Sequence, residues 1–333
     1  MKPLNKVIVN KDTSFNPIWI MRQAGRYLPE FREIRKKNPN FINLCLNENL
    51  SFEITLQPVT RFQLDAAIIF SDILMVPYGL GQKVEFQKNF GPILEGLNFD
   101  QISKTNETDF TKKLNPVYKA IKRVSINKNL NNKSTIGFVG APWTLLVYMI
   151  NQQSPKRKLK ENFFKDDFLI NKTLLIIEKF LKIHIKNQID NGANIIQIFD
   201  SWAGLLKEED LHRYIYEPTL NLVNYVKSLN IPVICFPREI KNYKKFCNIV
   251  KPNAVNIDYN IDPKKIVQDI QIPVQGGLDP KLLLTDKETL KKETKKYLDI
   301  FKDHPYIFNL GHGVLPETDP NMVDYLVKMV KNY

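Results

Sequence analysis

The sequence has few of the residues that build disulfide frameworks, metal centres and membrane spans. Only three of its 333 residues are cysteines (Cys45, Cys235 and Cys247), and only four are histidines. The odd number of cysteines and the lack of any CxxC pair argue against a disulfide framework and against a zinc or redox motif. No apolar run approaches the roughly 20 residues that span a bilayer. We therefore expect no bound metal, no cofactor, no redox-active cysteine pair and no membrane association.

The N-terminal stretch also lacks a targeting signal. Residues 1–13 have no apolar core and include Asp12, which is not typical of a secretory or transit segment. The simplest expectation is a cytoplasmic protein.

Charge is the one strong compositional bias, with a formal net charge of +13. The lysines are spread thinly in small groups, as in Lys156, Lys158 and Lys160, with Asn, Asp and Glu residues interspersed along the chain. A solvated, lysine-rich surface explains this pattern best, and a basic field that attracts an anionic substrate comes next. A nucleic-acid groove ranks third, because no recognised binding motif accompanies the charge.

Short apolar runs recur along the chain without strict polar alternation, which is typical of parallel strands buried on both faces. About eight such runs predict strands, at residues 18–21, 66–70, 135–139, 194–199, 232–236, 254–257, 273–276 and 306–309. Stretches with helical periodicity lie between them, at 49–64 with Ser51 as the expected cap, and at 168–191, 211–229 and 285–301.

Strand followed by helix, repeated about eight times, predicts an α/β protein with a single (β/α)8 TIM-type barrel over residues 1–333. Residues 79–98 read as a small hairpin inserted after the second strand. A doubly wound open sheet is the alternative, but a Gly-rich phosphate turn after the first strand is missing.

In such a barrel, the active site forms where the strands end. The first strand ends at Arg22 and Arg26, with Gly25 between them. Two guanidiniums at such a point suit the binding of carboxylates or phosphates, since each presents a planar fork of donors. Surface ion pairs are the simpler alternative for these arginines.

Polar residues at the later strand ends form a coherent set with them. Asp72 has apolar neighbours apart from Ser71, so it is either a structural ion-pair partner of Arg22 or Arg26, or a carboxylate that stabilises positive charge on a substrate. His312 stands between two glycines that leave its ring accessible. Tyr148 alone would be read as a core residue.

The motifs around these residues resemble the uroporphyrinogen decarboxylase family over essentially the whole chain. The similar segments are residues 17–32, 70–74, 137–145 with Tyr148 and Met149, 199–204, 275–280 and 309–313. The resemblance implies a cytoplasmic, homodimeric barrel enzyme without a cofactor. Its reaction would convert the four acetate side chains of uroporphyrinogen III into methyl groups, giving coproporphyrinogen III.

The resemblance also implies which residues act. Asp72, Arg22 and Tyr148 would be catalytic. The substrate contacts would be Arg22, Gln23, Ala24, Gly25, Arg26, Asp72, Tyr148, Ser201 and His312, with Arg35 as a further arginine of the first motif region.

These residue types suit a substrate that carries eight carboxylates. Several arginines and a histidine can bind its acidic arms, and Asp72 can stabilise a pyrrole ring that becomes cationic on protonation. Arginine rarely releases its proton, so the acid stays open among Arg22, Tyr148, His312 and water. The rival interpretations are a methyltransferase of the same barrel superfamily that acts with a corrinoid or zinc, and a basic protein that binds nucleic acid.

Overall fold

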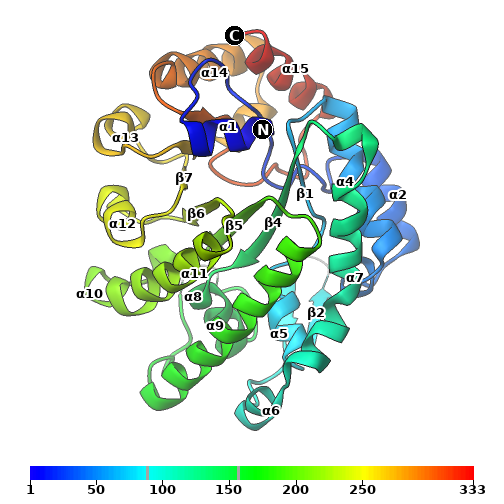
Figure 1. Cartoon of the computed structure of the whole chain (residues 1–333), viewed down its shortest axis with the longest axis vertical. Coiled ribbons are helices and arrows are strands. Elements are labelled where there is room, and N and C mark those ends of the chain that lie inside the picture. The colour runs from blue at the N-terminus through cyan, green and yellow to red at the C-terminus, as the bar shows by residue number, and fades with distance from the viewer. Residues whose placement is uncertain (88–89, 156–157) are drawn as a thin grey trace.

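The computed structural model describes residues 1–87, 90–155 and 158–333. Seven parallel strands form one curled sheet in the order β1-β4-β5-β6-β7-β8-β9 (Figure 1). They are β1 (Ala66–Ile68), β4 (Ser134–Gly140), β5 (Ile195–Asp200), β6 (Val233–Pro237), β7 (Ala254–Ile257), β8 (Val274–Gly276) and β9 (Tyr306–Ile307). The predicted α/β class and its parallel sheet are confirmed.

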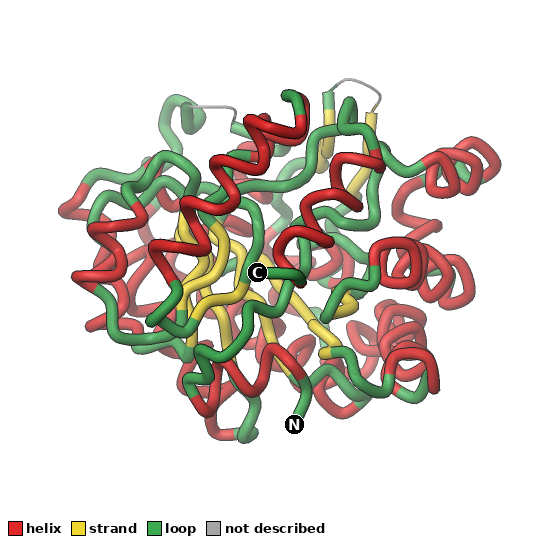
Figure 2. The backbone as a smooth tube through the Cα atoms, turned by 90° about the horizontal axis from the view of Figure 1, so that it is seen from above, coloured by secondary structure: helices red, strands yellow, loops and turns green. Residues whose placement is uncertain are grey.

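Helices surround the strands (Figure 2). The longer ones are α1 (Pro3–Asn10), α2 (Pro29–Lys37), α4 (Glu48–Phe62), α7 (Glu107–Ser125), α8 (Pro142–Asn151), α9 (Asp167–Asp190), α11 (Glu217–Ser228), α12 (Tyr243–Val250), α14 (Lys287–Phe301) and α15 (Pro320–Lys331). The shorter ones are α3 (Phe41–Cys45), α5 (Met75–Gly79), α6 (Phe99–Lys104), α10 (Glu208–Leu211) and α13 (Pro263–Asp269). Among the described residues, no helix is both long and apolar enough to cross a membrane.

The helix ends differ from the sequence prediction in two places. Helix α4 is capped by the Asn47 side chain, which accepts hydrogen bonds from the backbone N–H groups of Asn49 and Leu50. Ser51, the predicted cap, is instead buried within the helix, where its hydroxyl donates to the Phe70 carbonyl at 2.6 Å. The predicted helix 211–229 is divided between α10 and α11 by a π-helical segment, His212–Tyr216.

The segment predicted as the first strand does not form a regular ladder. Ile18 makes an isolated parallel bridge to Phe308, next to β9, and its carbonyl accepts the Asp65 N–H at 2.8 Å, next to β1. The next backbone N–H groups are bonded to side chains instead of to a neighbouring strand: Gln23 Oε1 accepts the Ile20 N–H at 3.1 Å. The strand pairing therefore ends after Ile18, although this segment contacts both edges of the sheet.

A second, antiparallel sheet of two strands follows β1 and α5. It pairs β2 (Val84–Gln87) with β3 (Gly91–Leu94). This is the interval in which the sequence predicts a hairpin, and residues 88 and 89 of that prediction lie outside the described residues.

The inner face of the sheet carries a small apolar cluster of its own. It contains alternate strand residues together with one face of α1, namely Leu4, Val7, Ile8, Trp19, Met21, Ala66, Ile136, Ile195, Ile234, Phe236, Ala254 and Ile307. Above it, the Trp19 indole donates to Gln275 at 2.8 Å, and the Gln275 amide donates to Gln197 and Asn256. These side-chain hydrogen bonds between β5, β7 and β8 help to fix one arrangement of the strands.

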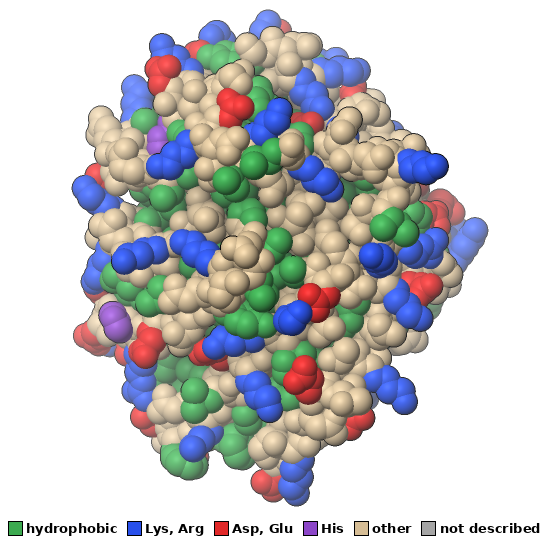
Figure 3. Space-filling model, viewed as in Figure 1, with side chains coloured by type: hydrophobic (Ala, Val, Ile, Leu, Met, Phe, Trp, Pro, Cys, Tyr) green, Lys and Arg blue, Asp and Glu red, His purple; other side chains and the backbone are tan. Residues whose placement is uncertain are grey.

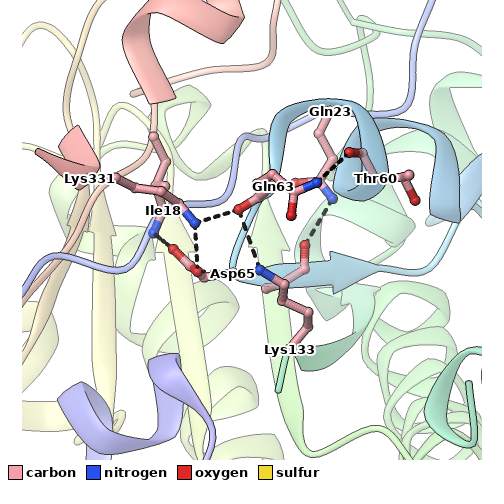
Figure 4. Close-up of polar contacts among 8 residues, drawn as sticks. Ile18, Gln23, Thr60, Gln63, Asp65, Lys133 and Lys331 are labelled. Atoms are coloured by element: carbon pink, nitrogen blue, oxygen red, sulfur yellow. Dashed lines mark hydrogen bonds and ion pairs between the residues drawn. The ribbon is translucent and has the colours of Figure 1, made fainter. Parts of the chain in front are cut away.

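Asp65 ties the Ile18 segment to the sheet (Figure 4). Its carboxylate accepts the Ile18 N–H at 2.9 Å and contacts Lys331 of α15 at 3.2 Å and Lys133 at 3.7 Å. Both lysines also donate to the Gln63 carbonyl. Four separate parts of the chain therefore meet at one acidic side chain.

The basic charge is dispersed. On the face shown in Figure 3, Lys and Arg side chains are scattered among uncharged and acidic ones. Several lysines pair with acidic residues on the same helix, as Lys186 does with Asp190 and Lys295 with Asp299. A solvated surface is consistent with this distribution.

Candidate functional site

The turn after Ile18 holds Arg22 in an unusual backbone conformation. Its φ is +62°, in the left-handed region that a non-glycine residue rarely adopts. The turn is held from both sides, because Asn309 Oδ1 accepts the Met21 N–H at 2.8 Å and the Gln23 amide donates to the Ala66 carbonyl at 3.1 Å. Surrounding structure that over-determines a strained residue is typical of functional sites.

The other predicted residues of this turn divide into two groups. Gln23 is fully buried, its side-chain amide bonds to the Ile20 N–H and the Ala66 carbonyl, and its own carbonyl accepts the Tyr27 hydroxyl. Its role in the structure is to shape the turn. Ala24 and Gly25 are half-buried, whereas Arg26 is exposed.

Gly313 brings the last predicted motif against Arg22. A Cβ at Gly313 would lie 2.3 Å from Arg22 Cδ, closer than any side chain permits. The aliphatic part of Arg22 therefore packs on the bare backbone beside His312. In this way the two ends of the chain meet at the strand ends.

Asp72 lies in the loop between β1 and α5. Its Oδ1 accepts the Leu74 N–H at 2.8 Å. Burial raises the pKa of Asp72 to about 6, while the Leu74 hydrogen bond and the Arg22 charge oppose that rise. Burial lowers the pKa of Arg22, and the charges of Tyr148 and Asp72 act in the opposite direction. The two predicted residues are thus electrostatic neighbours.

Tyr148 belongs to the same group. It projects from α8, which starts at Pro142 directly after β4, and its ring contacts Trp202 edge-on with centroids 5.9 Å apart. Burial and then the charge of Asp72 raise the pKa of Tyr148 to about 12. The phenol therefore keeps its proton at neutral pH.

His312 is held neutral. Burial, followed by the charges of Arg22 and Arg238, lowers its pKa to about 3. Its Nδ1 is buried and has no hydrogen-bond partner in the described part of the chain. A neutral imidazole beside arginines can hydrogen-bond an incoming carboxylate.

Ser201 follows the end of β5, two residues beyond Phe199, which packs against the inner cluster. Alternation along the strand places Ser201 on the same side. Arg35 lies near the end of α2, where its guanidinium donates to the Asn38 carbonyl and lies over the Phe41 ring at 5.5 Å.

Two further polar residues that follow apolar runs, Arg238 and Asp200, are not among the predicted site residues. Arg238 lies at the end of β6, and its charge acts on both Arg22 and His312. Asp200 is 3 % exposed at the end of β5, accepts the Thr144 hydroxyl at 2.6 Å and has a pKa raised by burial to about 7. The sequence signal for Arg238 is its position directly after the apolar run at 232–236.

The arrangement of these charged side chains suits the binding of a polyanion close to the Asp72 carboxyl group. Asp72 is an electrostatic neighbour of Arg22 and Tyr148, His312 is a neighbour of Arg22 and Arg238, and Arg26 and Arg238 add positive charge near Arg22. Within the residues that the structure describes, no group of three or more His, Cys, Asp or Glu side chains could hold a metal ion.

Comparison with solved structures identifies the fold. A methyltransferase from Methanosarcina mazei superimposes with a TM-score of 0.79 over 100% of this chain and 99% of its own, at 16% sequence identity. A B12-independent methionine synthase from a Shewanella species gives a TM-score of 0.50 over 85% of each chain, at 10% identity. At such identities the likeness concerns the fold alone.

Comparison of sequences identifies the family. Uroporphyrinogen decarboxylase from Rickettsia bellii is 41% identical over 324 residues, covering 95% of each chain. The enzyme of the same name from Wolbachia pipientis is 43% identical over 321 residues, covering 95% of this chain and 94% of its own. The family profile described as uroporphyrinogen decarboxylase (URO-D) matches residues 1–333, and the chain therefore belongs to the uroporphyrinogen decarboxylase family.

Proposed function

We propose that this chain is a carboxy-lyase that decarboxylates the four acetate side chains of uroporphyrinogen III and releases coproporphyrinogen III. The observation that carries the proposal is one half-buried carboxylate, Asp72, which is an electrostatic neighbour of Arg22, with further cationic groups near Arg22, in a chain of this family. The substrate presents many carboxylates around a ring of pyrrole N–H groups. The site offers the complementary set, with arginines for the carboxylates and one carboxylate for the N–H groups.

Asp72 stabilises the charge that develops during the reaction. Protonation of a pyrrole at the α-carbon next to the carbon that bears the acetate gives a cationic, iminium-like ring. Loss of CO₂ then sends the electron pair of the broken C–C bond into that ring and leaves an exocyclic methylene. A second proton converts the methylene into the methyl group, and loss of the proton on the α-carbon restores the pyrrole. An ionised Asp72 that accepts the pyrrole N–H bonds favours the cationic state strongly, because its surroundings are desolvated.

Arg22 and Arg26 bind and orient the acidic arms. Guanidinium rarely releases its proton, so these residues act chiefly as carboxylate partners. His312 is neutral, which makes it a hydrogen-bonding partner of a carboxylate. Arg22, Tyr148 and water are the candidate sources of the proton that reaches the substrate.

The pyrrole itself accepts the electrons in this scheme, so the reaction needs no cofactor. The methyltransferase alternative rests on a structural neighbour at 16% identity, which speaks for the fold only. The full-length relatives at 41% and 43% identity are named as decarboxylases.

The finer architecture belongs to the same proposal. The Ile18 segment hydrogen-bonds to Asp65 on one side and to Phe308 on the other, which supports an eighth strand position that closes the sheet into a single barrel over residues 1–333. The paired strands β2 and β3 then form the inserted hairpin. The enzyme works in the cytoplasm as a homodimer.

One incubation tests the activity. Purified protein and uroporphyrinogen III are mixed anaerobically without any added cofactor, and the products are oxidised and separated by chromatography. We expect porphyrins with successively fewer carboxyl groups, ending at coproporphyrin. Unchanged uroporphyrin, with the protein shown to be folded, would contradict the proposal.

A further inference from the structure

We propose that Arg238 is a third carboxylate-binding arginine of this site and that Glu239 occupies its guanidinium until a substrate carboxylate replaces it. The inference rests on the proposed function, since it assigns the ligand of Arg238 as an acidic arm of the tetrapyrrole. It goes beyond the residues that the family resemblance implies.

The strand register aims Arg238 at the site. Ile234 and Phe236 of β6 belong to the apolar cluster on the inner face of the sheet, while Val233 and Cys235 pack on the opposite face. Side chains alternate between the two faces of a strand. Arg238, two residues beyond Phe236, therefore continues the inner face at the strand end where Ser201 follows β5.

The backbone around Arg238 is held on three sides. Its N–H donates to the Asp200 carbonyl at 3.1 Å, and its own carbonyl accepts the Gly204 N–H at 3.1 Å. The next N–H, that of Glu239, donates to Asp258 Oδ2, which also accepts the Tyr243 hydroxyl at 2.8 Å. A side chain on such a fixed turn loses little freedom when it binds a ligand.

The backbone of Glu239 adopts a strained, left-handed conformation. Its φ is +62°, and a Cβ at the facing Gly204 would lie 2.5 Å from Glu239 Cβ. The strained turn sends the Glu239 carboxylate back to Arg238 Nη2, at 2.5 Å. A non-glycine residue in the left-handed region is strained, and the hydrogen bonds that hold the turn must offset that strain.

The pair leaves Arg238 only partly satisfied. The arginine side chain is 18% exposed and the glutamate 48% exposed, so the carboxylate lies toward solvent while the guanidinium is largely enclosed. Arg238 Nε is buried and has no partner among the described residues. Half-exposed ion pairs hold weakly, and a second carboxylate that reaches both Nε and Nη2 would bind in the bidentate manner that guanidinium favours.

The neighbouring charges favour this exchange. Arg22 and Arg238 both lower the pKa of His312, and Arg238 lowers that of Arg22, so the cationic groups repel one another. A substrate carboxylate placed between them removes that repulsion. Glu239, at the rim, compensates only Arg238.

Steady-state kinetics and direct binding test the inference with four variants. Arg238→Gln removes the charge, Arg238→Lys keeps the charge without the fork, and Glu239→Gln removes the internal competitor while keeping the backbone cost. Lys245→Gln is the matched control, because Lys245 makes an exposed ion pair with Glu208 at 2.7 Å on a nearby surface. Binding is followed by titration with uroporphyrin III, the stable oxidised form, so that it is measured independently of turnover.

For Arg238→Gln we expect KM for uroporphyrinogen and Kd for uroporphyrin to rise at least about tenfold, as for the loss of a hydrogen bond to a charged group, with kcat within about threefold of wild type. The KM and Kd of Arg238→Lys should lie between those of wild type and Arg238→Gln. Glu239→Gln should lower Kd, and Lys245→Gln should change neither KM nor Kd. An unchanged Kd in folded Arg238→Gln would overturn the inference. So would a rise in Kd for Glu239→Gln, which would make Glu239 a positioning residue instead of a competitor. Failure of the proposed function can be told apart from failure of this inference, because wild-type protein would then leave uroporphyrinogen unchanged.

Discussion

Replacement of Asp72 by asparagine should separate stability from activity. Asp72 is a carboxylate held in desolvated surroundings, and its pKa is raised from an ordinary 3.8 to about 6. Asparagine has nearly the same shape, can still accept the Leu74 N–H bond and carries no charge. The variant therefore imitates the protonated form of Asp72 at every pH.

The size of the stability effect follows from the pKa. Above pH 6 the carboxyl is ionised in both the folded and the unfolded protein, and the raised pKa corresponds to about 3 kcal/mol against the ionised folded state. Below pH 3.8 the group is protonated in both states, so the effect vanishes. Asp72→Asn should thus stabilise the protein at neutral pH by up to about 3 kcal/mol, or about 4 °C in Tm for a chain of this size. The gain should shrink as the pH falls from 6 toward 4.

The same change should remove activity. Without the negative charge, the cationic pyrrole loses its main stabilisation, and we expect kcat to fall by a factor of at least about 100. The assay pairs thermal unfolding between pH 4 and 8 with anaerobic turnover of uroporphyrinogen. Asp324→Asn, at an exposed ion pair with Lys328, is the control and should alter neither property measurably. Turnover near the wild-type rate in Asp72→Asn, or a lower Tm at neutral pH, would refute the reasoning.

Four further outcomes follow from the geometry. In wild type, kcat/KM should be constant above pH 7 and fall as the pH drops through about 6, because the ionised form of Asp72 is required; a profile flat to pH 5 would contradict this. Gly313→Ala should displace Arg22, whose Cδ would lie 2.3 Å from the new Cβ, and lower kcat/KM at least about tenfold, as steady-state kinetics on folded protein would show. His312→Ala should weaken substrate binding or slow later decarboxylations without abolishing the first; a dead enzyme with unchanged affinity would disagree. Asp65→Asn should cost about 1–3 kcal/mol in urea unfolding, because the carboxylate is 16% exposed and bonds the Ile18 N–H, with activity of the folded protein unaffected.

The sequence pattern was sufficient to locate those strands that are buried on both faces. The apolar runs at 135–139, 194–199 and 232–236 became β4, β5 and β6 within a residue or two, because strands buried on both faces must be apolar throughout. The strand-end position of Arg22 and Asp72 followed from the same reading. Those residues are near enough to run boundaries for the chain order alone to indicate a shared site.

Contacts between distant parts of the chain decided the rest. The sequence predicts Ser51 as a helix cap, but in the fold its hydroxyl donates to the Phe70 carbonyl. It predicts a strand at Ile18, but the backbone N–H groups of Ile20 and Met21 donate to the side chains of Gln23 and Asn309. Arg238 only follows an apolar run in the sequence, and the fold brings its charge near Arg22 and His312.

The sequence by itself therefore determined the class of fold, the family and the set of residues at the strand ends, because periodicity and motif are properties of neighbours along the chain. Only the tertiary structure decided that Gln23 shapes the turn, that Gly313 makes room for Arg22, and that Asp72 is desolvated enough to have a pKa near 6. Desolvation, close approach and competition for hydrogen bonds depend on what lies across the fold, and no local pattern records them.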